Sequence, residues 1–299
     1  MNLQIQKALK DKRLLKAIIG MSKKEFEQLL KKFAPLVMHK PYKKNRKRKP
    51  GAGRKHTLDT AEKKLFFILM YMKTYPAFDL AGFLWGVNRS QAKRWVDELR
   101  GKLEKALGKE MVLPERKVHS MVEFVQRFPQ VKKIIIDGTE RPIRRPKDKN
   151  KQKECYSGKK KRHTQKNIVI ASSKKEILVL SPTSNGREHD YTLLKKSGLL
   201  ESIPQDVVCY FDLGFVGVEK DYKVKCCLPY KKPRNGELTT QQKEFNKNLS
   251  RFRVRVENAL AGVKRFRCIS DICRNRSEEL KDHLMFLACG LWNFHLKVA

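Results

Sequence analysis

Three acidic residues stand where their side chains could together bind metal ions. Asp137 follows the apolar run III, and Asp212 follows the run CYF, with Gly214 shortly behind it. Short, continuously apolar runs are typical of strands buried on both faces, and neighbouring strands present the side chains at their ends to a common crevice. The third acid, Glu257, is surrounded by cations in RFRVRVENALAGVKRFR (251–267), within a long expected helix.

Three converging carboxylates repel one another unless a cation lies between them. Oxygen ligands alone suit Mg²⁺ or Mn²⁺, and a pair of such ions activates a water and stabilises the leaving oxygen of a phosphodiester. Structural alternatives stay open for each residue. Glu257 lies four residues after Arg253, the spacing of an intrahelical ion pair, and an Asp at a strand end often forms a turn or a cap.

The charge of the chain points to a polyanionic partner. The 299 residues include 68 Lys and Arg but 31 Asp and Glu, a formal net charge of +37. Self-repulsion of this size destabilises a lone protein, whereas each phosphate contact releases a counterion, so nucleic acid is the favoured partner. A membrane is disfavoured because no basic amphipathic helix stands apart, and the longest apolar stretch, 284–292, is too short to span a bilayer.

The cysteines and the start of the chain indicate a cytoplasmic protein, associated with the nucleoid if the host is a prokaryote. Seven Cys, an odd number at irregular spacing, suit free thiols in a reducing compartment. The segment MNLQIQKALKDKR has no uninterrupted apolar core, so we expect no signal peptide. We favour buried thiols over the alternative, a zinc site among Cys226, Cys227, Cys268 and Cys273.

The elements that must position the three acids alternate along the second half of the chain. Apolar runs predict strands at 131–139, 166–172, 175–184, 206–214 and 224–230, and helical patterns cover 189–198 and 239–266. Strands interleaved with helices are typical of an α/β fold.

The first half of the chain is helical and contains the pattern of a helix-turn-helix. A helix over 57–76 stops at Pro76, and Gly86 lies at a tight turn between two further short helical patterns. The second of these starts near Ser90, with an apolar stripe that leaves polar side chains free to read a DNA groove. Those side chains are Arg89, Gln91, Lys93 and Arg94. The alternative is three packed helices whose polar face binds nothing.

Five segments, in order, resemble the catalytic blocks of DDE transposases. They are IIIDGTE, YSGKKKRHTQKN, GREHD, YFDLGFVG and LSRFRVRVENALAGVKRF. The resemblance is to the insertion-sequence "DDE superfamily endonuclease" group, which is related to Harbinger-type elements. The segment from GAGRKHTLDT to WVDEL is similar to the helix-turn-helix region that precedes the catalytic domain in that group.

The resemblance implies a ribonuclease-H-like catalytic domain, a mixed sheet with flanking helices, whose metal-binding triad is Asp137, Asp212 and Glu257. It implies two divalent ions, Mg²⁺ or Mn²⁺, and double-stranded DNA, both element ends and target, as the partner of a homo-oligomer. The expected organisation is a helical segment at 1–39, a basic linker at 40–56, a helix-turn-helix at 57–115 and the catalytic domain at 130–299.

Two further groups of residues complete the expected site. Besides the four helix-turn-helix side chains, the residues expected to contact DNA are Arg46, Lys47, Arg48, Lys159, Lys160, Lys161, Arg162, Arg253, Lys264 and Arg265. The residues expected to support the metal ligands are Glu140, His189 and Asp190. As alternatives, Glu140 pairs with Arg141, and Asp190 caps the helix that follows it.

The expected function is therefore a transposase that cleaves DNA and joins the 3′ ends to a target. Two alternatives stay open: a domesticated relative that binds DNA without cutting it, and a metal-dependent nuclease of repair or defence. Terminal inverted repeats around the coding sequence would distinguish a transposase from both.

Overall fold

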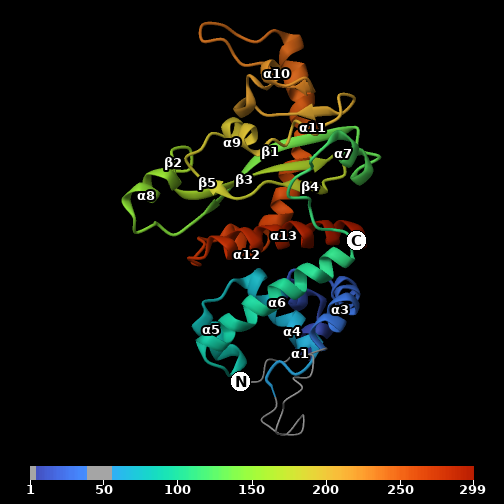
Figure 1. Cartoon of the computed structure of the whole chain (residues 1–299), viewed down its shortest axis with the longest axis vertical. Coiled ribbons are helices and arrows are strands. Elements are labelled where there is room, and N and C mark those ends of the chain that lie inside the picture. Colours follow the sequence, from blue (N-terminus) through green and yellow to red (C-terminus); the bar gives the residue numbers. More distant parts are fainter. Residues whose placement is uncertain (1–4, 39–55) are drawn as a thin grey trace. The chain divides into compact units, whose positions relative to one another are not determined.

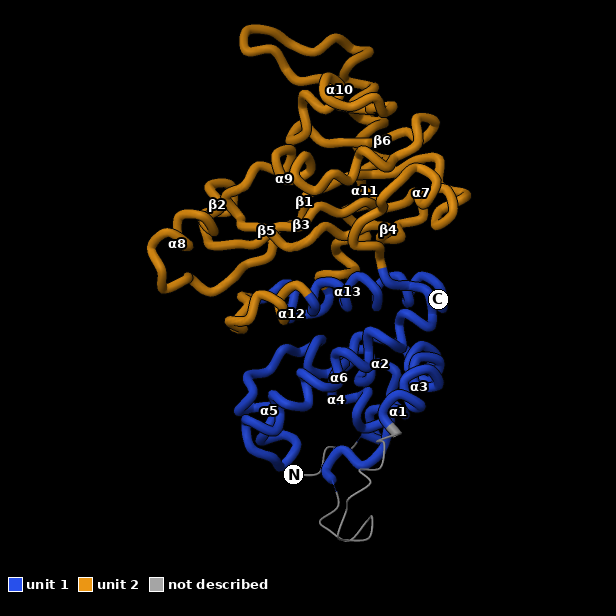
Figure 2. The backbone as a smooth tube through the Cα atoms, viewed as in Figure 1, with its two compact units in different colours: residues 1–113, 265–271, 283–299 blue, residues 114–264, 272–282 orange. Residues whose placement is uncertain are grey.

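The computed structural model describes residues 5–38 and 56–299, which form two compact units (Figures 1 and 2). One unit contains residues 1–113, 265–271 and 283–299, and the other contains residues 114–264 and 272–282. These units divide the chain differently from the functional domains expected from the sequence, which placed all of 130–299 together; those boundaries stay predictions. The expected DNA contacts Arg46, Lys47 and Arg48 lie outside the described residues.

The helical unit begins with α1 (Ile5–Lys10), α2 (Lys12–Ile19) and α3 (Lys23–Met38). Ser22 and Glu25 form the capping box that the sequence predicts at the start of α3. The backbone N–H of Ser22 donates to Glu25 Oε2 at 2.6 Å, and the Glu25 N–H donates to Ser22 Oγ at 3.3 Å. Each bond satisfies a donor that a helix start leaves without an intrahelical acceptor.

The expected helix-turn-helix consists of α4 (Ala61–Thr74), α5 (Phe78–Trp85) and α6 (Arg89–Lys109). Gly86 ends α5 with a left-handed φ of 63°, which glycine adopts at little cost. Asn88 then caps α6, its Oδ1 accepting from the Gln91 N–H at 2.8 Å. The turn between the two helices is therefore encoded locally, as the sequence predicts.

Residues from the end of the chain complete the helical unit. They belong to α12 (Arg267–Ser270) and to the part of α13 (Glu278–Val298) that begins at His283. Lys73 Nζ donates to the Arg265 carbonyl at 2.9 Å, and Asn293 Nδ2 donates to the Val112 carbonyl at 3.0 Å. The apolar stretch 284–292 is thus part of this core. Within the described ranges, none of the helices combines the length and apolar character needed to cross a bilayer.

The second unit is built on a mixed β-sheet, in agreement with the α/β class predicted from the sequence. Its strands are β1 (Lys133–Pro142), β2 (Tyr156–Ser157), β3 (Arg162–Ser172), β4 (Ile177–Leu180), β5 (Ser184–Asn185), β6 (Val208–Tyr210) and β7 (Lys225–Cys227). The central strand β1 pairs antiparallel with β3 and parallel with β6, and β6 pairs parallel with β7. Strand β4 pairs antiparallel with β3.

Helices cover this sheet and connect its strands (Figure 1). They are α7 (Met121–Arg127), α8 (Lys149–Cys155), α9 (Asp190–Ser197), the 3-10 turn η1 (Leu213–Phe215), α10 (Val218–Asp221) and α11 (Thr240–Lys264). Leu193 and Leu194 of α9 pack in one core with Ile134 and Ile136 of β1. Since side chains alternate between faces along a strand, Ile135 and Asp137 face the opposite side.

Candidate active site

The parallel pairing of β1 with β6 brings Asp137 and Asp212 to neighbouring positions. Ile135 pairs with Tyr210, and each aspartate lies two residues further along its chain in the same direction. Asp212 follows the end of β6 and caps η1, its Oδ1 accepting from the Gly214 N–H at 2.5 Å. The sequence therefore predicted correctly that the two acids belong to neighbouring apolar strand segments.

Asp137, however, does not end its strand as the sequence suggests. It is in the interior of β1, which continues to Pro142 because residues 138–142 keep pairing with 164–168 of β3. The apolar run ends at this point for another reason: beyond it, the strand carries polar side chains to both faces. The backbone before and after Asp137 is thus paired with β3, which fixes the position of this residue.

The Asp137 carboxylate carries an electrostatic cost that its surroundings do not remove. Burial raises its pKa to about 6, while Arg253 and the Gly138 N–H, which donates to Asp137 Oδ1 at 2.8 Å, act in the opposite direction. The negative charges of Asp212 and Asp190 raise the pKa further. Three carboxylates therefore interact here, which is the condition that favours a bound cation.

Asp190 reaches this cluster from the start of α9. Its Oδ1 accepts from Lys166 Nζ at 3.1 Å, and it does not cap the helix, since His189 is the cap residue and makes no side-chain cap bond. A Cβ atom placed on Gly138 would lie only 2.7 Å from Asp190 Cγ. The glycine thus leaves the space that the Asp190 side chain occupies.

Lys166 is a site residue that the sequence analysis missed. This buried ammonium also pairs with Glu140 Oε1 at 3.3 Å and donates to the Glu188 carbonyl at 2.9 Å. Glu140 and Lys166 are opposite each other in the β1–β3 ladder, whereas Arg141 donates to the Lys281 carbonyl at 2.9 Å and to Asn167 Oδ1 at 3.0 Å. The feature of the sequence that could have revealed Lys166 is its position, next to Asn167, at the start of a strongly apolar strand segment.

Glu257 differs from the three aspartates in its surroundings. The side chain is exposed on α11, and in the part of the chain that the structure describes it forms no ion pair. Arg253, its expected intrahelical partner, instead pairs with Asp212 Oδ2 at 3.5 Å. The salt-bridge alternative for Glu257 is therefore wrong, and what remains is a carboxylate without a structural role in this arrangement.

The carboxylates fit a divalent cation in chemistry, although they are not arranged as a finished metal site. Among residues 5–38 and 56–299, no three Asp, Glu, His or Cys side chains are grouped closely enough to hold an ion. The donors are nevertheless all oxygens, and the raised pKa of Asp137 reports negative charge that Arg253 only partly offsets. A hard cation such as Mg²⁺ suits both observations.

The residues expected to contact DNA fall into two groups. Lys159, Lys160 and Lys161 are exposed before β3, and Arg162 is exposed at its first position. Arg89, Lys93 and Arg94 are exposed on α6, with Gln91 half-buried. Arg253 instead pairs inside the site, and the Arg265 guanidinium packs over the Phe266 ring. Burial, followed by the charge of nearby Lys160, lowers the pKa of Lys264.

Of the three α6 cations expected to contact DNA, Arg94 is the one best placed for a partner outside the protein. Arg89 approaches Asp79 at 4.0 Å, and Lys93 pairs with Asp97 at 2.7 Å, whereas Arg94 forms no ion pair with any described residue. Five of the seven cysteines are buried, and none of the seven forms a disulfide.

An α/β unit with aspartates on neighbouring parallel strands, together with a helix-turn-helix, is the combination expected of an enzyme that acts on DNA. Comparisons with known proteins agree. Residues 136–293 match the family model of the DDE superfamily endonuclease, and residues 56–109 match the helix-turn-helix of DDE superfamily endonuclease.

A curated relative covers most of the chain. The probable transposase for insertion sequence element IS702 from Microchaete diplosiphon is 30% identical over 253 residues, 84% of this chain and 85% of the relative. No solved structure matches the chain. The chain therefore belongs to the DDE superfamily endonucleases and is a transposase of the insertion-sequence type.

Proposed function

We propose that the protein binds the terminal inverted repeats of its element, cleaves DNA there and joins the freed 3′ ends to target DNA. The observation that carries this proposal is the neighbouring position of Asp137 in β1 and Asp212 just after the parallel strand β6, in a chain that belongs to the DDE superfamily endonucleases. The helix-turn-helix, matched over residues 56–109, supports recognition of the element ends.

We also assign the α/β unit to the ribonuclease-H-like fold. Without the two-residue strands β2 and β5, the sheet order is β4–β3–β1–β6–β7. The first three strands along the chain are antiparallel, and the last two run parallel to β1. This arrangement supports the fold that the family resemblance implies.

In this proposal Asp137 and Asp212 hold divalent cations, Mg²⁺ or Mn²⁺, and two ions are expected. Bound ions supply an activated water and stabilise the leaving oxygen of a phosphodiester. Arg253 neutralises Asp212 in the structure as it stands, and Lys166 neutralises Asp190. Arg253 and Lys166 thus each hold one carboxylate near the expected position of the reacting phosphate and reduce the repulsion among the three acids.

Glu257 is the third ligand implied by the family motif. It lies one helical turn beyond Arg253 on α11, and Arg253 already reaches Asp212. Exposure leaves the Glu257 side chain free to change rotamer, so recruitment to the site requires no unfolding of α11. Asp190 is the competing candidate for the same role, because its charge already acts on Asp137.

The test is Mg²⁺-dependent cleavage of a duplex that carries the element end. Asp137→Asn and Asp212→Asn should each reduce cleavage by at least about a thousandfold, while DNA affinity changes little. The matched control is Asp206→Asn, an exposed acid paired with Lys132 at 2.7 Å, which should cleave normally. Full cleavage by either site variant would show that cutting depends on other residues, and the assignment of Asp137 and Asp212 to the active site would be wrong.

A further inference from the structure

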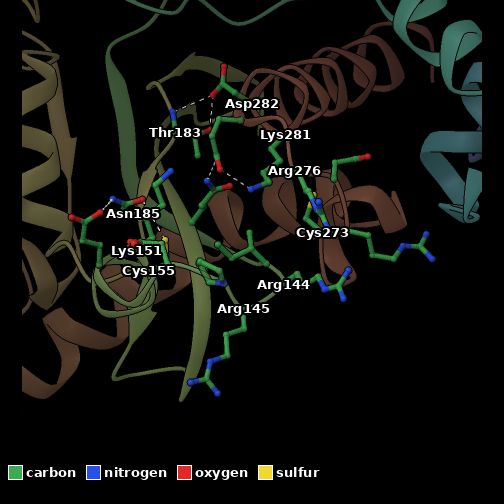
Figure 3. Close-up of a pocket in the computed structure, with 18 of the residues that line it drawn as sticks. Arg144, Arg145, Lys151, Cys155, Thr183, Asn185, Cys273, Arg276, Lys281 and Asp282 are labelled. Carbon is green, nitrogen blue, oxygen red and sulfur yellow. Dashed lines mark hydrogen bonds and ion pairs between the residues drawn. The ribbon is translucent and has the colours of Figure 1, made fainter.

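A pocket of about 820 Å³ opens in the α/β unit (Figure 3). Three segments contribute residues to its lining. They are residues 143–155, which lead from β1 through α8; residues 182–185, which follow β4; and residues 273–282. Gln165 of β3 also lines it. The volume lies in the range of pockets that hold ligands of nucleotide size.

The pocket lies on the same face of the sheet as Asp137. In the β1–β3 ladder Gln165 pairs with Arg141, and residues 137, 139 and 141 of β1 point to one face because side chains alternate. Arg141 lies four residues beyond Asp137 along β1, a distance of roughly 13 Å. A DNA strand that reaches Asp137 therefore passes within a few nucleotides of the pocket.

The interior of the pocket combines an apolar floor with one polar group that lacks a partner. The apolar floor is the small buried cluster of Ile143, Cys155 and Cys273. Gln165 is 4% exposed; its Nε2 donates to Glu278, but its Oε1 has no hydrogen-bond partner. A buried amide oxygen without a donor is uncommon in proteins, and a ligand N–H group would satisfy it.

The acids around the pocket are already engaged. Glu278 pairs with Lys281 at 2.8 Å, and Asp282 pairs with Arg116. Asp148 accepts from the Lys151 N–H at 2.8 Å, and Glu154 accepts from Asn185 at 3.1 Å. The negative charge at the rim is thus largely committed to protein partners.

Several cations at the rim have no such partner. The exposed side chains of Arg144, Lys147 and Arg276 form no ion pair with the residues that the structure describes. Figure 3 shows Arg144 and Arg276 on either side of the Cys273 label, and Arg145 extends away from them toward the bottom of the view. An anionic group at the mouth would therefore meet uncommitted positive charge, as a phosphate requires.

We propose that this pocket receives one unpaired nucleotide of a DNA strand that crosses the Asp137 face. The apolar floor takes the base, Gln165 Oε1 accepts from a base N–H, and Arg144 and Arg276 hold the flanking phosphates. A base within a duplex cannot enter, because its N–H groups are paired and its faces are stacked. The inference rests on the proposed action on DNA and adds a place for a nucleotide outside the double helix.

The experiment measures binding of the full-length protein to two 20-base-pair duplexes. One is fully paired, and the other has a single extra, unpaired 2-aminopurine whose fluorescence reports its environment. Wild type should bind the second duplex about tenfold more tightly and change the probe fluorescence, because each charge-assisted bond adds affinity. The double variant Arg144→Ala/Arg276→Ala should lose this preference and the fluorescence change.

The matched control, Lys220→Ala/Lys223→Ala, removes two exposed cations of the same unit that do not line the pocket. It should weaken both duplexes by one common factor and keep the preference. Gln165→Leu should reduce the preference at unchanged affinity for the paired duplex. Equal binding of both duplexes by wild type, or an equal loss on both for the rim variant, would overturn the pocket proposal alone. Failure of wild type to bind either duplex would overturn the proposed function as well.

Discussion

Gly138, in the interior of β1, lies against the carboxylate of Asp190. A Cβ atom at position 138 would come within 2.7 Å of Asp190 Cγ and within 3.0 Å of both carboxylate oxygens. Lys166 holds the same carboxylate from another side at 3.1 Å. Glycine weakens a strand interior, so its presence here is explained by this close approach of the acid to the backbone.

Gly138→Ala should therefore disturb the site more than the fold. The added methyl group must displace Asp190, which weakens its pairing with Lys166 and removes a charge from the neighbourhood of Asp137. We expect a loss of about 1–3 kcal/mol in the free energy of unfolding and a fall in single-turnover cleavage of at least about tenfold, with DNA affinity retained.

The matched control for this change is Gly158→Ala, since nothing lies within 4 Å of a Cβ atom at position 158. It should leave melting temperature and cleavage unchanged. Normal cleavage by Gly138→Ala would show that the position of Asp190 does not matter for catalysis.

Asp137→Asn should stabilise the metal-free protein at neutral pH. The pKa of Asp137 is raised from 3.8 to about 6, so the folded state binds this proton more tightly than the unfolded state does. Ionisation of Asp137 therefore costs stability above pH 6, and the cost disappears as the pH falls from about 6 to about 4. The asparagine variant, which never ionises, removes a cost of at most about 3 kcal/mol at pH 7.5.

Thermal melting in EDTA at pH 7.5 and at pH 4 measures this effect. The variant should melt above wild type at pH 7.5 and close to it at pH 4. Addition of Mg²⁺ should raise the melting temperature of wild type more than that of the variant, because the ion binds the folded state through this carboxylate. A variant less stable than wild type at pH 7.5 would show that the Asp137 charge is adequately paired by Arg253.

Arg94→Ala in the full-length protein should weaken recognition of the element end. Arg94 is exposed on α6 and forms no ion pair with any described residue, so its guanidinium is free to contact a base edge. We expect a loss of about 1–3 kcal/mol in the preference for the specific duplex over a random one. The control is Lys105→Ala on the same helix. Equal losses on both duplexes would indicate a phosphate contact instead of base readout.

A fragment covering residues 1–115 should not fold into a stable helix-turn-helix module. The helical unit includes residues 265–271 and 283–299, and removal of the chain end leaves Lys73 without its carbonyl acceptor and the Val112 carbonyl without Asn293. Circular dichroism and proteolysis of the fragment, compared with the full chain, measure the loss. A cooperative melting transition in the isolated fragment would contradict this expectation.

The sequence contained the local parts of the structure. Apolar runs located the strand that contains Asp137 and the strand that Asp212 follows. Gly86 indicated a turn, which its φ of 63° confirms. These features depend on neighbouring residues in the chain, so a single sequence reveals them. The two aspartates were predicted as neighbours because a common pattern, an apolar run followed by Asp, identified both.

Long-range pairings could not be obtained in the same way. Lys166 meets Glu140 only because β1 and β3 pair in one register across the intervening α8 segment, and a shift of one residue would separate them. From charge alone, Arg253 could pair with either Asp212 or Glu257. The packing of α11 against the sheet selects Asp212. The apolar stretch 284–292 indicated burial, but it did not indicate which unit would bury it.

The identity of the third carboxylate is the remaining question at the site, and a pair of variants decides it. Asp190→Asn removes a charge that already acts on Asp137 and leaves Lys166 with Glu140 as its partner. Glu257→Gln removes an exposed charge with no ion pair in the described structure, so it should change the melting temperature in EDTA very little.

If Glu257 binds metal, Glu257→Gln should nevertheless reduce single-turnover cleavage by orders of magnitude, lower the affinity for Mn²⁺ measured by calorimetry, and leave DNA affinity intact. Asp190→Asn should then cleave more slowly than wild type but bind Mn²⁺ nearly as well, since Asp190 acts on Asp137 through its charge without holding the ion. The matched control is Glu244→Gln, an exposed acid on the same helix, which should resemble wild type in every assay. Normal cleavage and normal Mn²⁺ affinity in Glu257→Gln, together with the loss of both in Asp190→Asn, would identify Asp190 as the third ligand. Loss of a metal ligand must reduce both metal affinity and cleavage, whereas loss of any other carboxylate leaves metal affinity nearly unchanged.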